Sequence, residues 1–400
     1  MRARIVGILG VATALVVWAM AACVGDSAST PQPAQGTEGG PCFSNGTCSG
    51  ALQCVVPNLC VKPGDGGVNP SDSSPGVDSS ADSSAVDGGA GAAPPVPPSC
   101  ATSGAGRTNC GAGSESCCTS LLVTGGTYNR TYANDAGIPS AEFDPATVGD
   151  FKLDKYEVTV GRFRQFVTAW NNGSGYTPPG GSGKHTHLNG GNGLNATGGG
   201  YEAGWAIGDN ANLSPTNTNL ACEANYATWT SAPGANETRP INCANWYELA
   251  AFCIWDGGFL PSEAEWEYAS AGGSEERKYP WGTVSPGTTN QYAIYNCYFP
   301  SSSGTCSTTA NIAPVGTPTS GVGKYGQLDL GGSVFEWDLD WYKTPFVACT
   351  NCVNATPSTG HLVRGGAFEE TDARLRPTSR PSQGATSRVF DLGGRCARKP

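Results

Sequence analysis

The sequence is poor in basic residues, with 23 Lys and Arg against 33 Asp and Glu and a formal net charge of −10. Nucleic acids and anionic membrane surfaces bind proteins through clustered Lys and Arg, which neutralise phosphates and release counterions. We therefore expect no nucleic acid partner. Calcium and cationic ligands are compatible with this charge.

Aromatic residues are absent from residues 61–99, which consist mainly of Gly, Ser, Asp, Pro and Ala. A segment of this composition cannot bury enough apolar surface to offset the entropy of ordering its backbone. We predict a disordered linker over 61–99, with an end-to-end distance on the order of 35 Å.

Residues 42–60 are too few to bury a core, yet they contain four cysteines spaced by six residues: Cys42, Cys48, Cys54 and Cys60. Disulfides must hold such a small module together. No charged or aromatic cluster marks a binding face in it, so a spacer role is favoured over a weak interaction role.

The N-terminus combines Arg2 and Arg4 with an apolar run from Ile5 to Trp18 and the ending Met20-Ala21-Ala22-Cys23. This pattern predicts a signal peptide over 1–22 and a lipid-modified Cys23, followed by a polar tether over 23–41. A lipid anchors a protein to a membrane without spanning it. The alternative is an uncleaved transmembrane anchor. Either way, we expect a bacterial protein that is exported and membrane-anchored, facing the periplasm or the cell surface.

The chain contains seventeen cysteines, and setting Cys23 aside leaves an even number. In an oxidising compartment this parity favours a framework of disulfides with no obligatory free thiol. A thiol nucleophile is therefore not indicated by the cysteine count alone.

Residues 100–400 hold nine of the ten tryptophans and are long enough for one substantial core. The tract 171–218 shows neither helical nor strand periodicity, so we expect much ordered loop. Three helices are predicted by their caps and apolar spacing: one after Thr159 that ends at Asn171, one after Asn245 with Glu248 three residues later, and one after Ser262 with Glu265 three residues later.

At these helices the sequence resembles the formylglycine-generating enzymes, also called sulfatase-modifying factors. The resemblance extends from about residue 121 to 398 and is carried by seven segments in order: Asp154 to Thr159, Asn245 to Cys253, Leu260 to Tyr268, Tyr279 to Gly282, Asp329 to Trp337, Arg364 to Gly366 and Gly394 to Arg398. It implies a modified C-type-lectin-like α+β fold, rich in loops and stapled by disulfides.

The resemblance also implies an activity. Members of the family oxidise a cysteine of sulfatases to formylglycine, using molecular oxygen and copper. A pair of cysteines after the Arg-Gly-Gly motif binds the copper. Soft thiolates suit Cu(I). Here no cysteine occurs between Cys352 and Cys396, so copper is doubtful. We favour a divergent member that binds a ligand, such as a glycan or an envelope protein. The alternative is a formylglycine-generating oxidase with an unrecognised metal site.

The family implies a disulfide between Cys253 and Cys396, which would tie the C-terminus to the core. Proximity in sequence suggests two further disulfides, one between Cys222 and Cys243 and one between Cys297 and Cys306. For Cys349 and Cys352, a disulfide is favoured over a displaced copper pair. The four cysteines Cys100, Cys110, Cys117 and Cys118 allow three pairings, and the sequence does not choose among them.

Structural calcium is implied by the family for the segment from Asp329 to Trp337. The carried-over ligands are the side chains of Asp329 and Glu336 and the backbone carbonyls of Gly332 and Val334, all of them oxygens, as calcium prefers. A second family site would begin near Asn296. The alternative is a carboxylate pair that caps turns.

Other candidates are weaker. His185 and His187 have a metal-like spacing, but no carboxylate lies near them in the sequence, so a solvated loop is favoured. Glu263 and Glu267 are expected on opposite sides of a short helix rather than in a catalytic pair. Four arginines are expected to brace loops rather than to bind an anion: Arg364, Arg376, Arg380 and Arg395.

Overall fold

The structure is a computed structural model, and it describes residues 53–55, 59–61, 96–133, 144–343 and 347–400. The chain forms two compact units, Met1–Ala90 and Gly91–Pro400. In the first unit, β1 (Gln53–Val55) and β2 (Leu59–Val61) pair antiparallel with Cys54 opposite Cys60. The predicted signal peptide, Cys23, the tether and most of the linker lie outside the described residues. Within those residues, no helix is long and apolar enough to cross a bilayer.

The second unit contains four α-helices among its described residues: α1 (Val160–Trp170), α2 (Asn217–Leu220), α3 (Trp246–Trp255) and α4 (Glu263–Ala271). Short 3₁₀ helices connect them: η1 (Pro98–Cys100), η2 (Asn171–Gly173), η3 (Asn189–Gly191), η4 (Ile207–Asn212), η5 (Gly273–Glu275), η6 (Thr309–Asn311), η7 (Thr319–Gly321) and η8 (Asp372–Leu375).

Strands of this unit are mostly two to four residues long. They are β3 (Ser120–Val123), β4 (Gly126–Asn129), β5 (Pro145–Val148), β6 (Phe151–Asp154), β7 (Asn195–Ala196), β8 (Phe335–Trp341), β9 (Cys349–Thr350), β10 (Cys352–Val353), β11 (His361–Arg364), β12 (Ser382–Gln383), β13 (Leu392–Gly393) and β14 (Ala397–Arg398).

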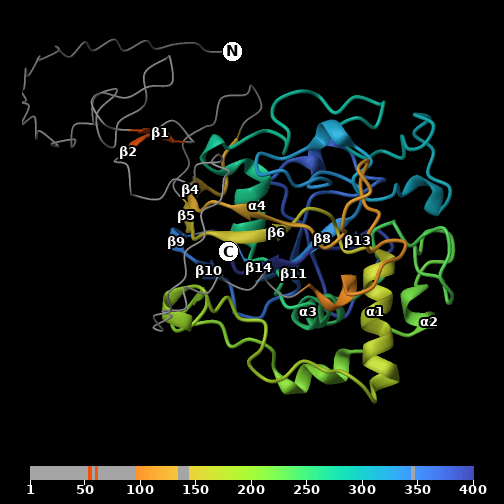
Figure 1. The fold of residues 1–400 in the computed structure, drawn as a ribbon, viewed down its shortest axis with the longest axis horizontal. Helices are drawn as coiled ribbons and strands as arrows, with labels where there is room; N and C mark the ends of the chain where they lie inside the picture. Colours follow the sequence, from red (N-terminus) through yellow and green to blue (C-terminus); the bar gives the residue numbers. More distant parts are fainter. Residues whose placement is uncertain (1–52, 56–58, 62–95, 134–143, 344–346) are drawn as a thin grey trace, which may run out of the picture. The chain divides into compact units, whose positions relative to one another are not determined.

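The strands form several small sheets instead of one large sheet. The largest has the order β12-β11-β8-β13, with β8 antiparallel to β11 and parallel to β13. Two three-stranded sheets have the orders β14-β6-β3 and β4-β5-β9, and β7 pairs with β10. The long loop after α1 runs past α3 along one side of the domain (Figure 1). The predicted α+β, loop-rich architecture is confirmed.

All three predicted helices are present, with the predicted caps. The Thr159 side chain accepts the Arg162 N–H at the start of α1, and Asn171 ends that helix in the left-handed conformation, with φ 48°. Helices α3 and α4 each begin with a capping box, built by Asn245 with Glu248 and by Ser262 with Glu265. These caps satisfy backbone N–H groups that a helix start leaves without partners.

Aromatic side chains join the helices to the largest sheet. Phe163 and Phe166 of α1 pack against Phe252 of α3, with ring centroids 5.6 and 6.0 Å apart. Trp337 of β8 is fully buried in the same core. A second core lies between α4 and the strands β4, β5 and β6, around the buried Trp266. The domain therefore has a continuous apolar interior despite its short elements.

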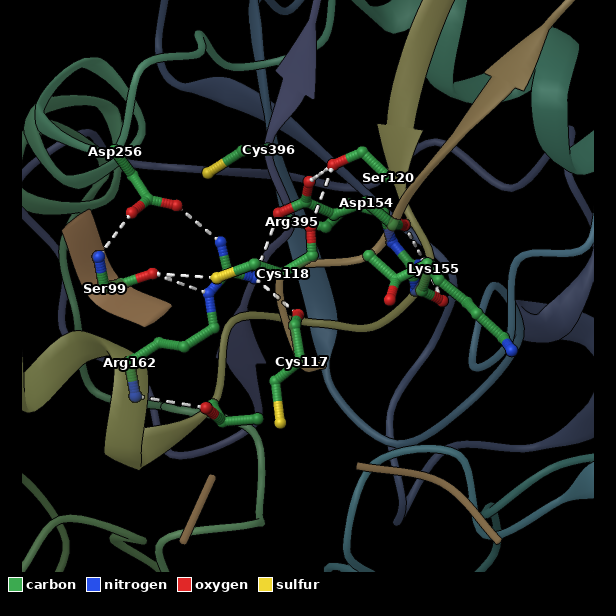
Figure 2. A network of polar contacts seen from close by, with 12 residues as sticks. Ser99, Cys117, Cys118, Ser120, Asp154, Lys155, Arg162, Asp256, Arg395 and Cys396 are labelled. Atoms are coloured by element: carbon green, nitrogen blue, oxygen red, sulfur yellow. Dashed lines mark hydrogen bonds and ion pairs between the residues drawn. The ribbon is translucent and has the colours of Figure 1, made fainter. Parts of the chain in front are cut away.

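A buried ionic network fixes the start of the domain (Figure 2). Arg162 donates to Ser99 Oγ at 3.1 Å, to Asp154 at 3.0 Å and to Asp256 at 2.7 Å. Arg398 contacts the same two carboxylates from the C-terminal strand. Ser99 is fully buried and lies in η1 with Pro98, so these two residues belong to the folded domain and not to the linker predicted over 61–99.

Six disulfides cross-link residues 96–400. The four predicted pairs are present: Cys253–Cys396, Cys349–Cys352, Cys222–Cys243 and Cys297–Cys306. The four N-terminal cysteines of this unit pair as Cys100–Cys118 and Cys110–Cys117. This nested arrangement is one of the three pairings that the sequence left open.

Candidate functional site

A bulge in the largest sheet places His361 at the wall of a cavity. Along β8 and β11, His361 lies opposite Trp341 and Val363 opposite Trp337, so β8 contains extra residues between the two positions. Bulges of this kind redirect side chains and are common beside functional sites. The Nδ1 atom of His361 lies 3.1 Å from the Leu339 carbonyl oxygen.

The His361 ring is enclosed by two tryptophans. Its centroid lies 4.0 Å from that of Trp246 and 3.9 Å from that of Trp341. Burial lowers the pKa of His361 to about 3, so the ring is neutral at physiological pH. With Nδ1–H donating to Leu339, Nε2 is left as an acceptor, and it has no hydrogen-bond partner among the described residues.

The cavity beside this ring has a volume of about 170 Å³. Its wall is mostly apolar and comes from α3, β8, β10, β11 and the loop 182–209. The lining residues are Ser182, Gly183, Glu202, Ala203, Gly204, Trp205, Asp209, Trp246, Ala250, Ile254, Leu260, Leu339, Trp341, Val353, Ala355 and His361. We call this the aromatic cavity. A mostly apolar pocket with a few polar groups is typical of a small-molecule site.

Two carboxylates, Glu202 and Asp209, lie in the wall of the aromatic cavity. Glu202 contacts Nδ1 of His185 at 3.1 Å, and Glu265 contacts Nε2 of the same ring at 3.0 Å. Burial lowers the pKa of His185, but these two carboxylates outweigh burial and raise the pKa to about 10. One imidazolium therefore balances only one of the two carboxylates. Asp209 is half-buried, and burial raises its pKa.

These contacts correct the prediction for His185. Its side chain is fully buried instead of lying in a solvated loop. The prediction was wrong because both partners are remote in the sequence: Glu202 is 17 residues away and Glu265 is 80 residues away. Glu265 also caps α4, so one carboxylate serves both the helix start and the histidine.

Glu263 and Glu267 also differ from the prediction. Both carboxylates contact the buried guanidinium of Arg364, with Glu267 Oε2 at 2.9 Å. They lie on the same face of α4 because residues four positions apart on a helix are neighbours. Arg364, Arg380 and Arg395 brace the fold as predicted, each through a carboxylate and a backbone carbonyl.

The segment after Arg364-Gly365-Gly366 carries acidic and aromatic residues where the resemblance implies a copper-binding cysteine pair. Burial, followed by repulsion from Asp391 and Glu370, raises the pKa of Glu369 to about 7. Phe368 lies 5.7 Å from Tyr226 between ring centroids. All twelve cysteines of residues 96–400 are in disulfides. No thiolate pair is available there, so these residues do not fit copper.

The predicted calcium ligands lie in a buried acidic region. Glu336 is bound by Arg395 through both oxygens, at 2.7 Å each, and Asp329 accepts the Gly316 N–H at 2.6 Å. Burial and the neighbouring Glu336 raise the pKa of Asp329 to about 6. Glu157 adds a third carboxylate, which accepts from Ser333 and from the Val334 N–H.

Three carboxylates thus face one guanidinium in this region. Among the described residues, however, no three carboxylates, histidines or cysteines are grouped so that they could hold a metal ion, so calcium at this segment stays a prediction from the family resemblance. The predicted backbone ligands Gly332 and Val334 are anchored there, because Gly332 N–H donates to Gly365 at 2.8 Å. Asn296, where a second family site was predicted to begin, donates its backbone N–H to the Glu370 carbonyl.

The aromatic cavity was missed in the sequence because its residues are scattered from 182 to 361. A stacked His361 between Trp246 and Trp341 requires contacts between α3, β8 and β11 that no local pattern shows. The available signal was weaker: Trp205 lies in the loop 171–216 and Trp341 ends β8, so neither of these two tryptophans belongs to a regular apolar stripe of a helix.

The described domain is a disulfide-stapled α+β domain of the modified C-type-lectin-like class. Residues 108–400 match the model of the sulfatase-modifying factor enzyme 1-like domain. The chain belongs to this family.

Several relatives can be compared. The formylglycine-generating enzyme of Thermomonospora curvata is 25% identical over 315 residues, covering 70% of this chain and 93% of the relative. The inactive C-alpha-formylglycine-generating enzyme 2 of Bos taurus is 30% identical over 165 residues, covering 40% of this chain and 50% of the relative. The chain spans about half the length of three further formylglycine-generating enzymes, 44% to 52%.

Among solved structures, PvdO from Pseudomonas aeruginosa is similar, with 18% identity and a TM-score of 0.44. The match covers 70% of this chain and 94% of that protein.

Proposed function

We propose that this chain is an exported, lipid-anchored protein whose sulfatase-modifying-factor-like domain binds a ligand and does not oxidise cysteine. One observation carries the proposal: every cysteine of residues 96–400 is in a disulfide, and none follows the Arg-Gly-Gly motif before Cys396. Cu(I) needs soft thiolate ligands, which oxidised cysteines do not provide.

The aromatic cavity supports the binding half of the proposal. It combines three indole side chains, Trp205, Trp246 and Trp341, with the carboxylate of Asp209 and the neutral ring of His361. Rigid apolar walls with few polar groups bind small molecules without a large ordering cost. A glycan or an envelope protein remains the predicted partner class, and lipid on Cys23 would hold the domain at the membrane.

Calcium belongs to the proposal as a structural ion. Asp329 and Glu336 would supply carboxylate oxygens, and Gly332 and Val334 would supply carbonyls. The surplus negative charge around Arg395 supports this placement. Bound calcium would stabilise the folded state in proportion to its concentration over its dissociation constant.

The competing function is cysteine oxidation through an unrecognised metal site, with Cys349 and Cys352 as displaced ligands. It is tested by oxygen consumption of the copper-treated full chain with a cysteine-containing sulfatase peptide. We expect no copper-dependent uptake above that of the C349A/C352A variant. Copper-dependent uptake that this variant loses would establish the oxidase and refute the proposed function.

A further inference from the structure

We propose that the aromatic cavity selects a small organic ammonium ion whose apolar body is about the size of one ring. This inference rests on the proposed function only in that the domain binds a ligand, and it assigns the aromatic cavity a ligand class other than a glycan. Three features of the cavity carry it: its volume, its uncompensated negative charge and the one-sided hydrogen-bonding character of its wall.

The volume limits the apolar body of the ligand. At about 170 Å³, the aromatic cavity is close in size to apolar protein cavities of roughly 150 Å³ that hold a benzene molecule. Ile254, Leu260, Leu339 and Val353 supply an aliphatic wall. A six-membered apolar ring would remove this surface from water, which favours binding.

The charge of the wall selects for a cation. Asp209 and Glu202 are acidic, and the described residues that line the cavity include no lysine or arginine. Lys184 follows the lining residue Gly183 in the chain but is not itself in the wall. His185 is shared between Glu202 and Glu265, so it leaves one negative charge unbalanced. Cations are further attracted to the faces of indole rings.

The hydrogen-bonding side chains of the wall act mainly as acceptors. Asp209 offers carboxylate oxygens. Nε2 of His361 has no partner among the described residues, but the atom is buried and offers no accessible surface to a ligand. The indole N–H groups of Trp205 and Trp246 already donate within the protein, to Asn210 and to the Asp338 carbonyl. An ammonium group donates and does not accept, so it matches this wall. A sugar needs donors as well as acceptors.

Isothermal titration calorimetry of the full chain tests this inference with four probes: 2-phenylethylammonium, its neutral analogue 2-phenylethanol, the anion 3-phenylpropanoate and N-acetylglucosamine. We expect the ammonium ion to bind about tenfold more tightly than the alcohol, a difference of about 1.4 kcal/mol. The anion and the sugar should show no saturable binding. Added salt should weaken the binding of the ammonium ion and leave the binding of the alcohol unchanged.

Variants locate the binding. D209N should reduce ammonium affinity about five- to tenfold and leave the affinity for the alcohol within twofold. D150N, which removes an exposed carboxylate that contacts only the Gly125 N–H in the described domain, is the matched control and should change neither. A250L places extra methyl groups into the cavity from α3 and should abolish both; its thermal unfolding shows whether the fold is retained.

The outcomes separate this inference from the proposed function. Equal affinity for the ammonium ion and the alcohol, or an unchanged ammonium affinity in D209N, would overturn the cation inference. Saturable binding of N-acetylglucosamine but not of the ammonium ion would also overturn it and would support the proposed function. Failure of every probe would count against both.

Discussion

Arg162 is a fully buried cation that contacts two fully buried carboxylates, Asp154 and Asp256. Removing one partner of a buried ion pair leaves a charge without compensation, which costs more than the pair itself contributes. Arg398 contacts the same carboxylates and would compensate in part. The network thus concentrates a large share of the local stability in a few side chains.

We expect R162M to destabilise the domain by about 3 to 5 kcal/mol, because methionine keeps the volume and removes the charge. Denaturant unfolding of the full chain measures the effect. The control is R374A, since Arg374 is an exposed partner of Glu370 at 3.9 Å; its cost should stay within about 1 kcal/mol. Equal effects of the two variants would show that burial does not set the cost.

Glu369 predicts a pH dependence. Burial and the neighbouring Asp391 raise its pKa in the folded state to about 7, above its ordinary value of 4.5. The protonated carboxyl is therefore favoured by folding. Its contribution is fully present below pH 4.5 and is lost as the pH rises through 7.

We expect the thermal midpoint of the full chain to fall between pH 5 and pH 8, and E369Q to reduce that fall because the amide does not titrate. Differential scanning calorimetry at four pH values measures both slopes. A slope that E369Q leaves unchanged would contradict the assignment and would point to other raised carboxyls, such as Asp340, whose pKa burial raises to about 7.

At the residue scale, the sequence predicted roles that depend on near neighbours and missed those that depend on remote ones. The cap formed by Ser262 with Glu265 spans three residues and was predicted correctly. The second role of Glu265, as a partner of His185, spans 80 residues and was not. The bracing role of Arg364 was predicted, but not its partners on α4.

At the scale of elements, the helices are set by their own sequences. Helix α3 begins with a capping box in which Asn245 accepts the Glu248 N–H and Glu248 accepts the Asn245 N–H. Glu248 also pairs with Arg388 at 2.5 Å. Helix α3 supplies Trp246, Ala250 and Ile254 to the aromatic cavity, so its cap positions one wall of the candidate site.

We expect N245A to cost about 1 kcal/mol, the usual value of a lost N-cap. N245D retains an acceptor for the Glu248 N–H and should cost less. Chemical denaturation of the two variants gives the comparison. If N245D were as destabilising as N245A, the cap acceptor would not be the source of the effect, and the contact of the Asn245 amide with the Asn212 carbonyl would explain it.

The loop 171–216 shows why part of the site could not be predicted. It contains no regular strand or helix beyond short 3₁₀ turns and the two residues of β7, so periodicity gives no information about its side chains. It nevertheless contributes His185, Glu202, Trp205 and Asp209 to the candidate site. Long-range contacts with α3, α4 and β10 fix this loop, and such contacts have no local signature.

At the scale of the whole molecule, disulfides substitute for long regular elements. The Cys253–Cys396 bond links α3 to the last strands across 143 residues. In the chain-entropy model, closing a longer loop restricts the unfolded chain more and stabilises the fold more. Cys396, one end of this bond, lies close to Arg162 and Arg395 (Figure 2).

We expect C253A/C396A to lose roughly 5 kcal/mol in the chain-entropy model. The comparison is C297A/C306A, which opens a loop with a sequence separation of 9 and should lose roughly 2.5 kcal/mol. Thermal and denaturant unfolding under oxidising conditions measure both. A larger loss from the short loop would show that local packing, and not loop closure, sets the stabilisation.

Cysteine chemistry across the domain also decides its function. The most direct measurement maps free thiols of the full chain by alkylation and mass spectrometry, before and after titration with Cu(I). We expect no free thiol among residues 96–400 and no stoichiometric copper. One copper per chain bound through reduced Cys349 and Cys352 would contradict the ligand-binding account and would make the oxidase the leading function.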